Sequence, residues 1–291
     1  MRIRDLFIKY SSKIDLLDFE LIVAHTINKS REFVLAYPEY KISKFKIENL
    51  KLKISRRMRG EPLAYILGHK EFYGLDFKVN ENTLIPRPET EILAELALQE
   101  LATNNLQPIT IIDIGTGSGN IIISLAKNSK SCRLSVVGCK LFGVDISDEA
   151  LKIAKYNAKK HKVVKKIKFL KGNFLNPIIK NTKYQIPDAK YVILANLPYL
   201  SEKIYGSASR EVKREPKSAL LSAEEGLSHY KKLFAQIKKL SVVGCKLLVL
   251  IEISPEQKNR ITKLIKTLFS GAKIRFFKDL AGKWRICKIT L

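Results

Sequence analysis

The sequence predicts an α/β fold with a doubly wound, mostly parallel sheet, preceded by a small helical domain. From Glu89 onward, short apolar runs alternate with helical patterns, as in sheets whose parallel strands are joined by helices. A glycine-rich turn directly follows the first run, and a helical apolar spacing fills residues 1–68. The predicted strands are Thr110–Ile114, Leu141–Asp145, Ile167–Leu170, Tyr191–Ala195 and Lys246–Ile251.

The 291 residues are enough for a large domain and a smaller one, and we expect three parts. Residues 1–68 form the helical N-terminal domain, in which Asp15 or Asp18 caps the second helix and Ser43 begins a later one. Residues 69–82 form a hairpin linker, because aromatic and polar residues alternate around Gly74. Residues 83–291 form the domain that carries the sheet.

The sequence argues against a membrane-spanning protein and against a secreted one. No apolar stretch approaches the ~18 residues of a membrane-spanning helix, and the run Leu247–Ile251 is closed by Glu252. The start of the chain meets charge early and lacks the apolar stretch of a secretory signal. We therefore expect a cytoplasmic protein. The four cysteines form no Cys-x-x-Cys pair and the four histidines show no metal-ligand spacing, which predicts reduced thiols and no metal.

The formal net charge is +25. Such a charge suits a polyanionic partner, through weak contact with nucleic acid or the ribosome. Heavy use of lysine on every face of the molecule accounts for the same value. Charge alone identifies no partner.

The segment Ser-Val-Val-Gly-Cys-Lys occurs twice, at 135–140 and at 241–246. The second copy leads directly into a predicted strand. The first lengthens a connection where fewer residues would suffice, so we interpret it as an insertion. It precedes the amino end of a strand, away from the expected site, and we assign it no function.

A glycine loop closes the first predicted strand and opens the apolar helix that begins at Asn120. Glycines allow a tight turn and close ligand approach, and the N–H groups of a helix start face an anionic group. The Gly-x-Gly-x-Gly spacing differs from the Gly-x-Gly-x-x-Gly of dinucleotide folds and favours the carboxylate of a methionine moiety. The predicted cofactor-binding residues here are Gly115, Thr116, Gly117, Ser118 and Gly119.

The next two strand ends add a nucleoside site. The carboxylate of Asp145 can accept hydrogen bonds from both hydroxyls of a ribose, as it also would in an NAD enzyme. Asn173 can meet an adenine amino group, and the ring of Phe174 can stack on the base. Together with the loop, these residues predict a class I, Rossmann-like methyltransferase that uses S-adenosylmethionine as methyl donor.

The fourth strand is followed by Asn-Leu-Pro-Tyr, at 196–199. Asn-x-Pro-Tyr looks like the motif of methyltransferases that modify planar amino or amide nitrogens. Such nitrogens are poor nucleophiles, so hydrogen-bond acceptors must position them. We predict that the side-chain oxygen of Asn196 and the carbonyl of Leu197 each accept one N–H, while Tyr199 covers the planar face. Asn196 and Tyr199 are the predicted catalytic residues, and Pro198 completes the substrate-binding segment.

Over nearly its whole length the chain resembles the release factor glutamine methyltransferases. The matching segments are Glu61–Gly68, Glu71–Gly74, Leu84–Glu91, Asp113–Gly119, Glu215–Leu220, Gly226–Leu227 and Asp279–Gly282. The resemblance implies methylation of the side-chain amide of the glutamine in the Gly-Gly-Gln motif of peptide chain release factors, hence a role in translation termination. It implies that residues 1–68 recognise the substrate and that Asn196 also contacts the cofactor.

Two departures from the family pattern stand out. Leu197 occupies the place of the first proline of Asn-Pro-Pro-Tyr, so a rigid ring is lost and an N–H is gained. Phe174 stands where many members carry tryptophan. Asn-Leu-Pro-Tyr resembles the ribosomal RNA adenine dimethyltransferases, which keeps an RNA amino group as an alternative acceptor. A non-catalytic RNA- or ribosome-binding protein with a relict cofactor fold is a third hypothesis.

Overall fold

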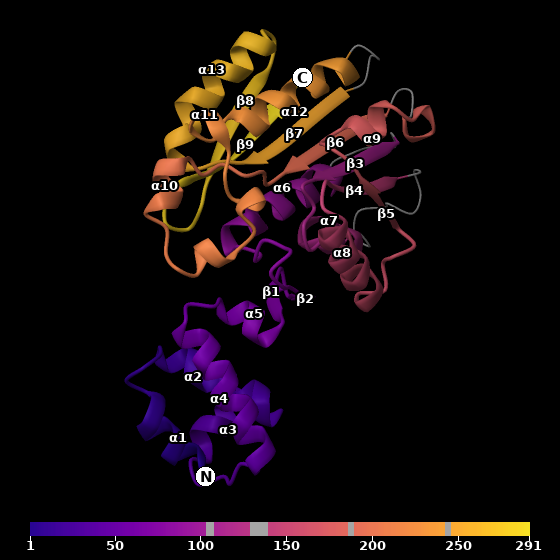
Figure 1. The fold of residues 1–291 in the computed structure, drawn as a ribbon. Helices are drawn as coiled ribbons and strands as arrows, with labels where there is room; N and C mark the ends of the chain where they lie inside the picture. The colour runs from indigo at the N-terminus through magenta and orange to yellow at the C-terminus, as the bar shows by residue number, and fades with distance from the viewer. Residues whose placement is uncertain (103–107, 129–138, 186–188, 242–245) are drawn as a thin grey trace. The chain divides into compact units, whose positions relative to one another are not determined.

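The computed structural model describes residues 1–102, 108–128, 139–185, 189–241 and 246–291. The chain divides into two compact units. The first comprises Met1–His69 and Ala208–Arg214, and the second comprises Lys70–Ser207 and Glu215–Leu291. Figure 1 labels the helices and strands of both.

The first unit is helical. Its elements are α1 (Ile3–Tyr10), α2 (Leu16–Ile27), α3 (Arg31–Ala36), α4 (Lys44–Met58), α5 (Leu63–Leu67) and the 3-10 turn η4 (Val212–Arg214). Asp15 caps α2, because its carboxylate accepts hydrogen bonds from the backbone N–H groups of Leu17 and Asp18. Ser43 is the N-cap residue of α4 but makes no capping bond with its side chain. The apolar faces of these helices form one buried core.

The segment Ala208–Arg214 belongs to the helical unit, although it lies 139 residues beyond the end of the first segment of that unit (208 minus 69). Arg57 of α4 links the two segments. Its guanidinium donates to the carboxylate of Asp18 and, at 2.6 Å, to that of Glu211. Charge-assisted hydrogen bonds of this kind give a specific attachment. No local pattern in the sequence indicates it.

The second unit contains a seven-stranded sheet. Its strands are β3 (Ile109–Ile114), β4 (Lys140–Asp145), β5 (Ile167–Lys171), β6 (Lys190–Ala195), β7 (Lys246–Glu252), β8 (Lys273–Lys278) and β9 (Trp284–Thr290), in the order β5-β4-β3-β6-β7-β9-β8. β3 to β7 pair in parallel, and β9 pairs antiparallel with both β7 and β8. The strand order reverses between β3 and β6, and a crevice at the carboxyl ends is expected at such a point.

Helices cover both faces of this sheet. The α-helices are α6 (Glu91–Ala102), α7 (Asn120–Asn128), α8 (Asp148–Lys160), α9 (Asn176–Ile179), α10 (Glu202–Gly206), α11 (Ala223–Gly226), α12 (Ser228–Ser241) and α13 (Lys258–Leu268). The 3-10 turns are η1 (Pro88–Thr90), η3 (Thr182–Tyr184), η5 (Lys217–Ala219) and η6 (Pro255–Gln257). Strands β1 (His69–Phe72) and β2 (Leu75–Lys78) form the predicted hairpin, with Tyr73 and Gly74 at φ of 53° and 69° in its two-residue turn.

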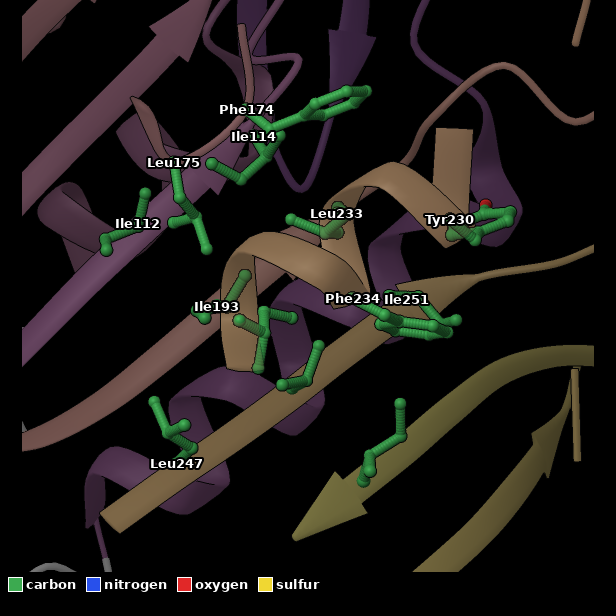
Figure 2. Close-up of a cluster of buried hydrophobic side chains, with 14 of the residues drawn as sticks. Ile112, Ile114, Phe174, Leu175, Ile193, Tyr230, Leu233, Phe234, Leu247 and Ile251 are labelled. Carbon is green, nitrogen blue, oxygen red and sulfur yellow. The ribbon is translucent and has the colours of Figure 1, made fainter. Parts of the chain in front are cut away.

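Successive strand residues enter opposite cores. Ile112 of β3 lies in a core with α12 and α13, whereas its neighbour Ile111 lies in a second core with α6 and α7. β6 repeats this alternation with Ile193 and Val192. Figure 2 shows the first core, where Leu233 and other side chains of α12 lie over the sheet. Strands β3 and β6 are therefore buried on both faces, as their near-continuous apolar runs predict.

The predicted fold class is confirmed, and each of the five predicted strands is present. Strands β8 and β9 were not predicted. Residues 129–138 and 242–245 lie outside the described residues, so the interpretation of the repeated segment as an insertion is not tested. Within the described ranges, no helix combines the length and apolar character needed to cross a membrane.

Candidate active site

A cavity of about 290 Å³ opens at the carboxyl ends of β3, β4 and β6. Its lining includes Gly115 and Gly117 from the glycine loop, Asp145 at the end of β4, and Phe174 beyond β5. From the segment after β6 come Asn196, Leu197 and Pro198. Residues predicted from four separate strand ends therefore meet at one site.

Three members of the glycine loop do not line this cavity. Thr116 is buried and donates its hydroxyl to Asp113 at 2.6 Å, and the Ser118 hydroxyl bonds the side chain of Asn120 at 3.2 Å. A Cβ on Gly119 would lie 2.7 Å from Ile123 and 3.2 Å from the Cβ of Ala154. Gly119 thus allows close packing against α8, and the side chains of Thr116 and Ser118 hold the turn.

Asp145 is tied to the glycine loop by its own carboxylate. One oxygen accepts from the N–H of Gly117 at 2.8 Å, and the other accepts from the N–H of Ser147 at 2.9 Å. Burial raises the pKa of Asp145, and these N–H groups oppose that rise. Each carboxylate oxygen has a second lone pair, so the group can still accept hydrogen bonds from a ligand in the cavity.

Phe174 has a backbone conformation that side chains seldom adopt, with φ of 53°. Its buried ring meets the His229 ring edge-on, with 6.0 Å between centroids. The Ser222 hydroxyl lies 2.8 Å from Nδ1 of His229. Asn173 and His229 also line the cavity. The backbone conformation of Phe174 and its contact with His229 together fix the position of its ring, which offers an aromatic surface suited to a planar base.

Asn196 is held by a chain of side-chain hydrogen bonds. Its Nδ2 donates to the Thr90 hydroxyl at 3.1 Å, and that hydroxyl donates to Oε2 of Glu252 at 2.6 Å. Because the nitrogen of the amide is engaged by Thr90, its oxygen is the atom left to accept a hydrogen bond from a ligand. This is the acceptor that the sequence motif requires.

Residues 196–199 form the acceptor segment. After Asn196, this segment contacts α12 and β7. Leu197 is buried, and its N–H faces the hydroxyl oxygen of Tyr230, a donor that proline would lack. Tyr199 does not line the cavity; its hydroxyl donates to Oε1 of Glu252 at 3.3 Å. Burial raises the pKa of Tyr199, so the phenol stays neutral.

Two family models match the chain: a methyltransferase domain over residues 107–267 and a PrmC N-terminal domain over residues 3–68. A release factor glutamine methyltransferase of Dictyoglomus turgidum is 36% identical over 274 residues, covering 94% of this chain and 90% of that protein. One from Bacillus subtilis is 33% identical and covers 93% and 90% of the two chains. The chain belongs to the release factor glutamine methyltransferase family. It is an enzyme, and its sheet-bearing unit contains the methyltransferase domain.

The methyltransferase fold is shared with distant proteins. The hMettl16 catalytic domain, solved in complex with the MAT2A 3'UTR hairpin 6, superposes with a TM-score of 0.54 at 15% identity. The match covers 82% of this chain and 81% of that one. At this identity the likeness shows the fold alone.

Several residues of the methyltransferase site were not singled out from the sequence. Residues 81–84 line the cavity, and so do Pro216, Ser218 and Ala219. They are joined through Glu215, whose buried carboxylate accepts from the N–H of Ile85 at 2.9 Å and pairs with Arg87. Both segments overlap or adjoin the family-like stretches Leu84–Glu91 and Glu215–Leu220, and this resemblance is the sequence feature that could have identified them. Thr90 and Glu252 had no local signal of their own.

Gly226 of the methyltransferase allows a close backbone approach to Tyr199. Its φ is 89°, and a Cβ there would overlap the Tyr199 carbonyl oxygen and Nε2 of Gln257. Gly226→Ala is therefore expected to lower the free energy of unfolding by about 3 kcal/mol, measured by chemical denaturation. Gly206→Ala is the control, because a Cβ at Gly206 meets no atom within 4 Å. Equal, small effects of both substitutions would contradict this reading.

Proposed function

We propose that this enzyme transfers a methyl group from S-adenosylmethionine to the side-chain amide nitrogen of the glutamine in the Gly-Gly-Gln motif of peptide chain release factors. The observation that carries the proposal is the orientation of Asn196, whose Nδ2 is bound to Thr90 while the residue lines the cavity. An amide oxygen is thereby kept available to accept an N–H of a planar amide. The family relatives, which are named for this reaction, support the same acceptor.

The cavity residues fit S-adenosylmethionine. Gly115 and Gly117 have φ of 71° and 54° and line the cavity, so backbone and ligand can approach closely. Asp145 offers acceptor lone pairs for ribose hydroxyls, and Phe174 offers an aromatic surface for adenine. When bound, the cofactor supplies an electrophilic methyl group on a sulfonium. We assign Gly115, Gly117, Asp145, Phe174 and Asn196 to its binding, and Thr116, Ser118 and Gly119 to supporting the loop.

The acceptor residues position a weak nucleophile. The oxygen of Asn196 and the carbonyl of Leu197 accept the two N–H groups of the glutamine amide, which aims the nitrogen at the methyl. Hydrogen-bond acceptors placed where positive charge develops lower the barrier, because they need no reorganisation during the reaction. Pro198 lines the acceptor side of the cavity, and Tyr199 supports the segment from outside the lining through its bond to Glu252. The nitrogen becomes more acidic as its bond to the methyl forms, so a strong general base is not required.

The helical unit is the part to which we assign recognition of the release factor. The PrmC N-terminal domain model covers residues 3–68, and the catalytic machinery described above lies in the second unit. The net charge of +25 suits a release factor complex and RNA equally, so the identity of the methyl acceptor distinguishes the two.

The test offers the purified enzyme and labelled S-adenosylmethionine a release factor and ribosomal RNA in the same reaction. Label is expected in the release factor and is expected to vanish when the Gly-Gly-Gln glutamine is replaced. Label in the RNA would instead favour the adenine amino group, in keeping with Leu197 and the basic charge. Label in neither, with no binding of the cofactor by calorimetry, would revive the non-catalytic hypothesis.

A further inference from the structure

Glu252 is a buried carboxylate next to the acceptor segment, and no step of the reaction described above uses it. In the parallel pairing of β6 with β7, Ala195 lies opposite Ile251. Asn196 and Glu252 therefore follow equivalent positions on adjacent strands, at the carboxyl edge of the sheet. Thr90, at the end of η1, stands between their side chains.

The hydrogen bonds around Glu252 have a defined polarity. An ionised carboxylate has no proton to donate, so both of its neighbours must donate to it. The Thr90 hydroxyl has one proton and gives it to Oε2, so toward Asn196 it can only accept. The donor end of the Asn196 amide must then face Thr90. A reversed amide would place two acceptors against each other.

We propose that Glu252 is a positioning residue that fixes the amide orientation of Asn196 through Thr90 and anchors Tyr199 directly. The proposal rests on the proposed function, since it assigns to Asn196 the task of accepting an N–H from the glutamine. It adds a residue from β7 to the acceptor site. Glu252 touches neither substrate nor cofactor in this role.

The main chain of Glu252 reinforces the arrangement. The buried hydroxyl of Tyr230 donates to the Glu252 carbonyl oxygen, and the N–H of Leu197 faces the same hydroxyl. One residue of β7 is thus connected to Asn196 through Thr90 and to Tyr199 directly, and its carbonyl oxygen holds the Tyr230 hydroxyl that Leu197 faces.

Burial raises the pKa of Glu252 to about 7. The hydrogen bonds from Thr90 and Tyr199 and the charge of Arg285 oppose this rise, whereas the charge of Glu89 adds to it. The phenols of Tyr199 and Tyr230 stay neutral, because burial raises the pKa of each. Protonation of Glu252 turns one carboxylate oxygen into a hydroxyl, which is a donor and a poor acceptor. The bond that this oxygen accepts, from Thr90 or from Tyr199, is therefore weakened below pH 7.

The test uses the full chain with three variants. Thr90→Val keeps the shape of the side chain and removes the hydroxyl, so kcat for methyl transfer should fall about tenfold, while the Kd for S-adenosylmethionine stays within about threefold. Thr90→Ser restores the hydroxyl and should recover most of the lost rate. Glu252→Gln retains an oxygen for Thr90 and does not titrate.

The pH profile separates a positioning role from a structural one. Wild-type kcat should decline as pH falls through about 7, and Glu252→Gln should lack this decline. The stability sign is opposite. The pKa of Glu252 in the folded protein lies above its ordinary value of 4.5. The free energy of unfolding of the wild type therefore falls as pH rises from 4.5 to about 7, because ionisation of the buried carboxyl group is unfavourable. Above that range, Glu252→Gln should have the higher free energy of unfolding.

A spectroscopic readout tests the proposal apart from the proposed function. The side-chain amide resonances of Asn196, assigned by their absence from Asn196→Asp, should shift in Thr90→Val and return toward their original positions in Thr90→Ser. Unchanged resonances in Thr90→Val, or an acid decline that persists in Glu252→Gln, would overturn the positioning role. Absence of methyl transfer by the wild type would overturn only the proposed function, because the resonances report the orientation of Asn196 directly.

Discussion

Asn196→Ala is expected to lower kcat by about a hundredfold to a thousandfold, while the Kd for S-adenosylmethionine changes by less than about fivefold. In the proposed reaction, Asn196 supplies a hydrogen-bond acceptor at the point where the nucleophilic nitrogen must be held. Alanine also removes the N–H that the Thr90 hydroxyl accepts, while the bond from Thr90 to Glu252 remains. Single-turnover methyl transfer and calorimetry measure the two quantities separately.

The matched control for this variant is Asn259→Ala. Asn259 is an exposed residue in the first turn of α13, and it does not line the cavity. Its replacement should leave both quantities unchanged. If Asn196→Ala lost cofactor affinity as severely as it lost rate, Asn196 would serve the cofactor rather than the acceptor, and the division of roles would be wrong.

Asp145→Ala is expected to do the reverse, weakening S-adenosylmethionine binding by about a hundredfold with a smaller effect on kcat at saturating cofactor. The substitution removes the acceptors that we assign to the ribose hydroxyls of the cofactor. It also removes the partner of the Gly117 N–H, which lies 2.8 Å from the Asp145 carboxylate. Calorimetric titration with the cofactor measures the loss.

Asp148→Ala controls for the removal of a negative charge near the end of β4. Asp148 lies in the first turn of α8, where its exposed carboxylate pairs with Lys171. Exposed ion pairs contribute little, so cofactor affinity should stay within about threefold of wild type. Similar losses in the two variants would mean that general electrostatics, and not the position of Asp145, governs binding.

The parts of the fold that follow from local pattern could be predicted. Strands β3, β4, β6 and β7 are apolar runs, because burial on both faces imposes that composition, whereas the edge strand β5 mixes apolar residues with lysine. Strands β8 and β9 lie toward one edge of the sheet, and β8, from Lys273 to Lys278, contains only exposed and half-buried residues. Such a short strand with no buried residue gives a weak pattern in the sequence. These two strands were not predicted.

The candidate site was predictable where function depends on a residue at a strand end. Gly115, Asp145, Phe174 and Asn196 follow four different strands, and the parallel sheet brings such ends to one edge. The direction of each side chain was not predictable. Within the glycine loop the side chain of Thr116 turns away from the cavity to bond Asp113, a choice made by the turn geometry.

The network around Glu252 could not have been predicted from local pattern. Thr90 and Glu252 are separated by 162 positions in the chain and meet only through the pairing of the strands and the packing of η1 against them. In the sequence, Glu252 is a polar residue at the end of an apolar run, and many strands end in this way, so its position alone does not indicate a role. Its role depends on Thr90 and Tyr199, and those contacts exist only in the folded protein.

The identity of the methylated atom shows whether the enzyme modifies the side-chain nitrogen of the Gly-Gly-Gln glutamine. The enzyme is incubated with a release factor and S-adenosylmethionine, and the Gly-Gly-Gln peptide is fragmented in a mass spectrometer. One methyl group on the side-chain nitrogen of that glutamine, absent without the enzyme and strongly reduced with Asn196→Ala, is the predicted result. A methyl group on another residue of the release factor, or on an adenine of ribosomal RNA in place of the glutamine, would contradict the account.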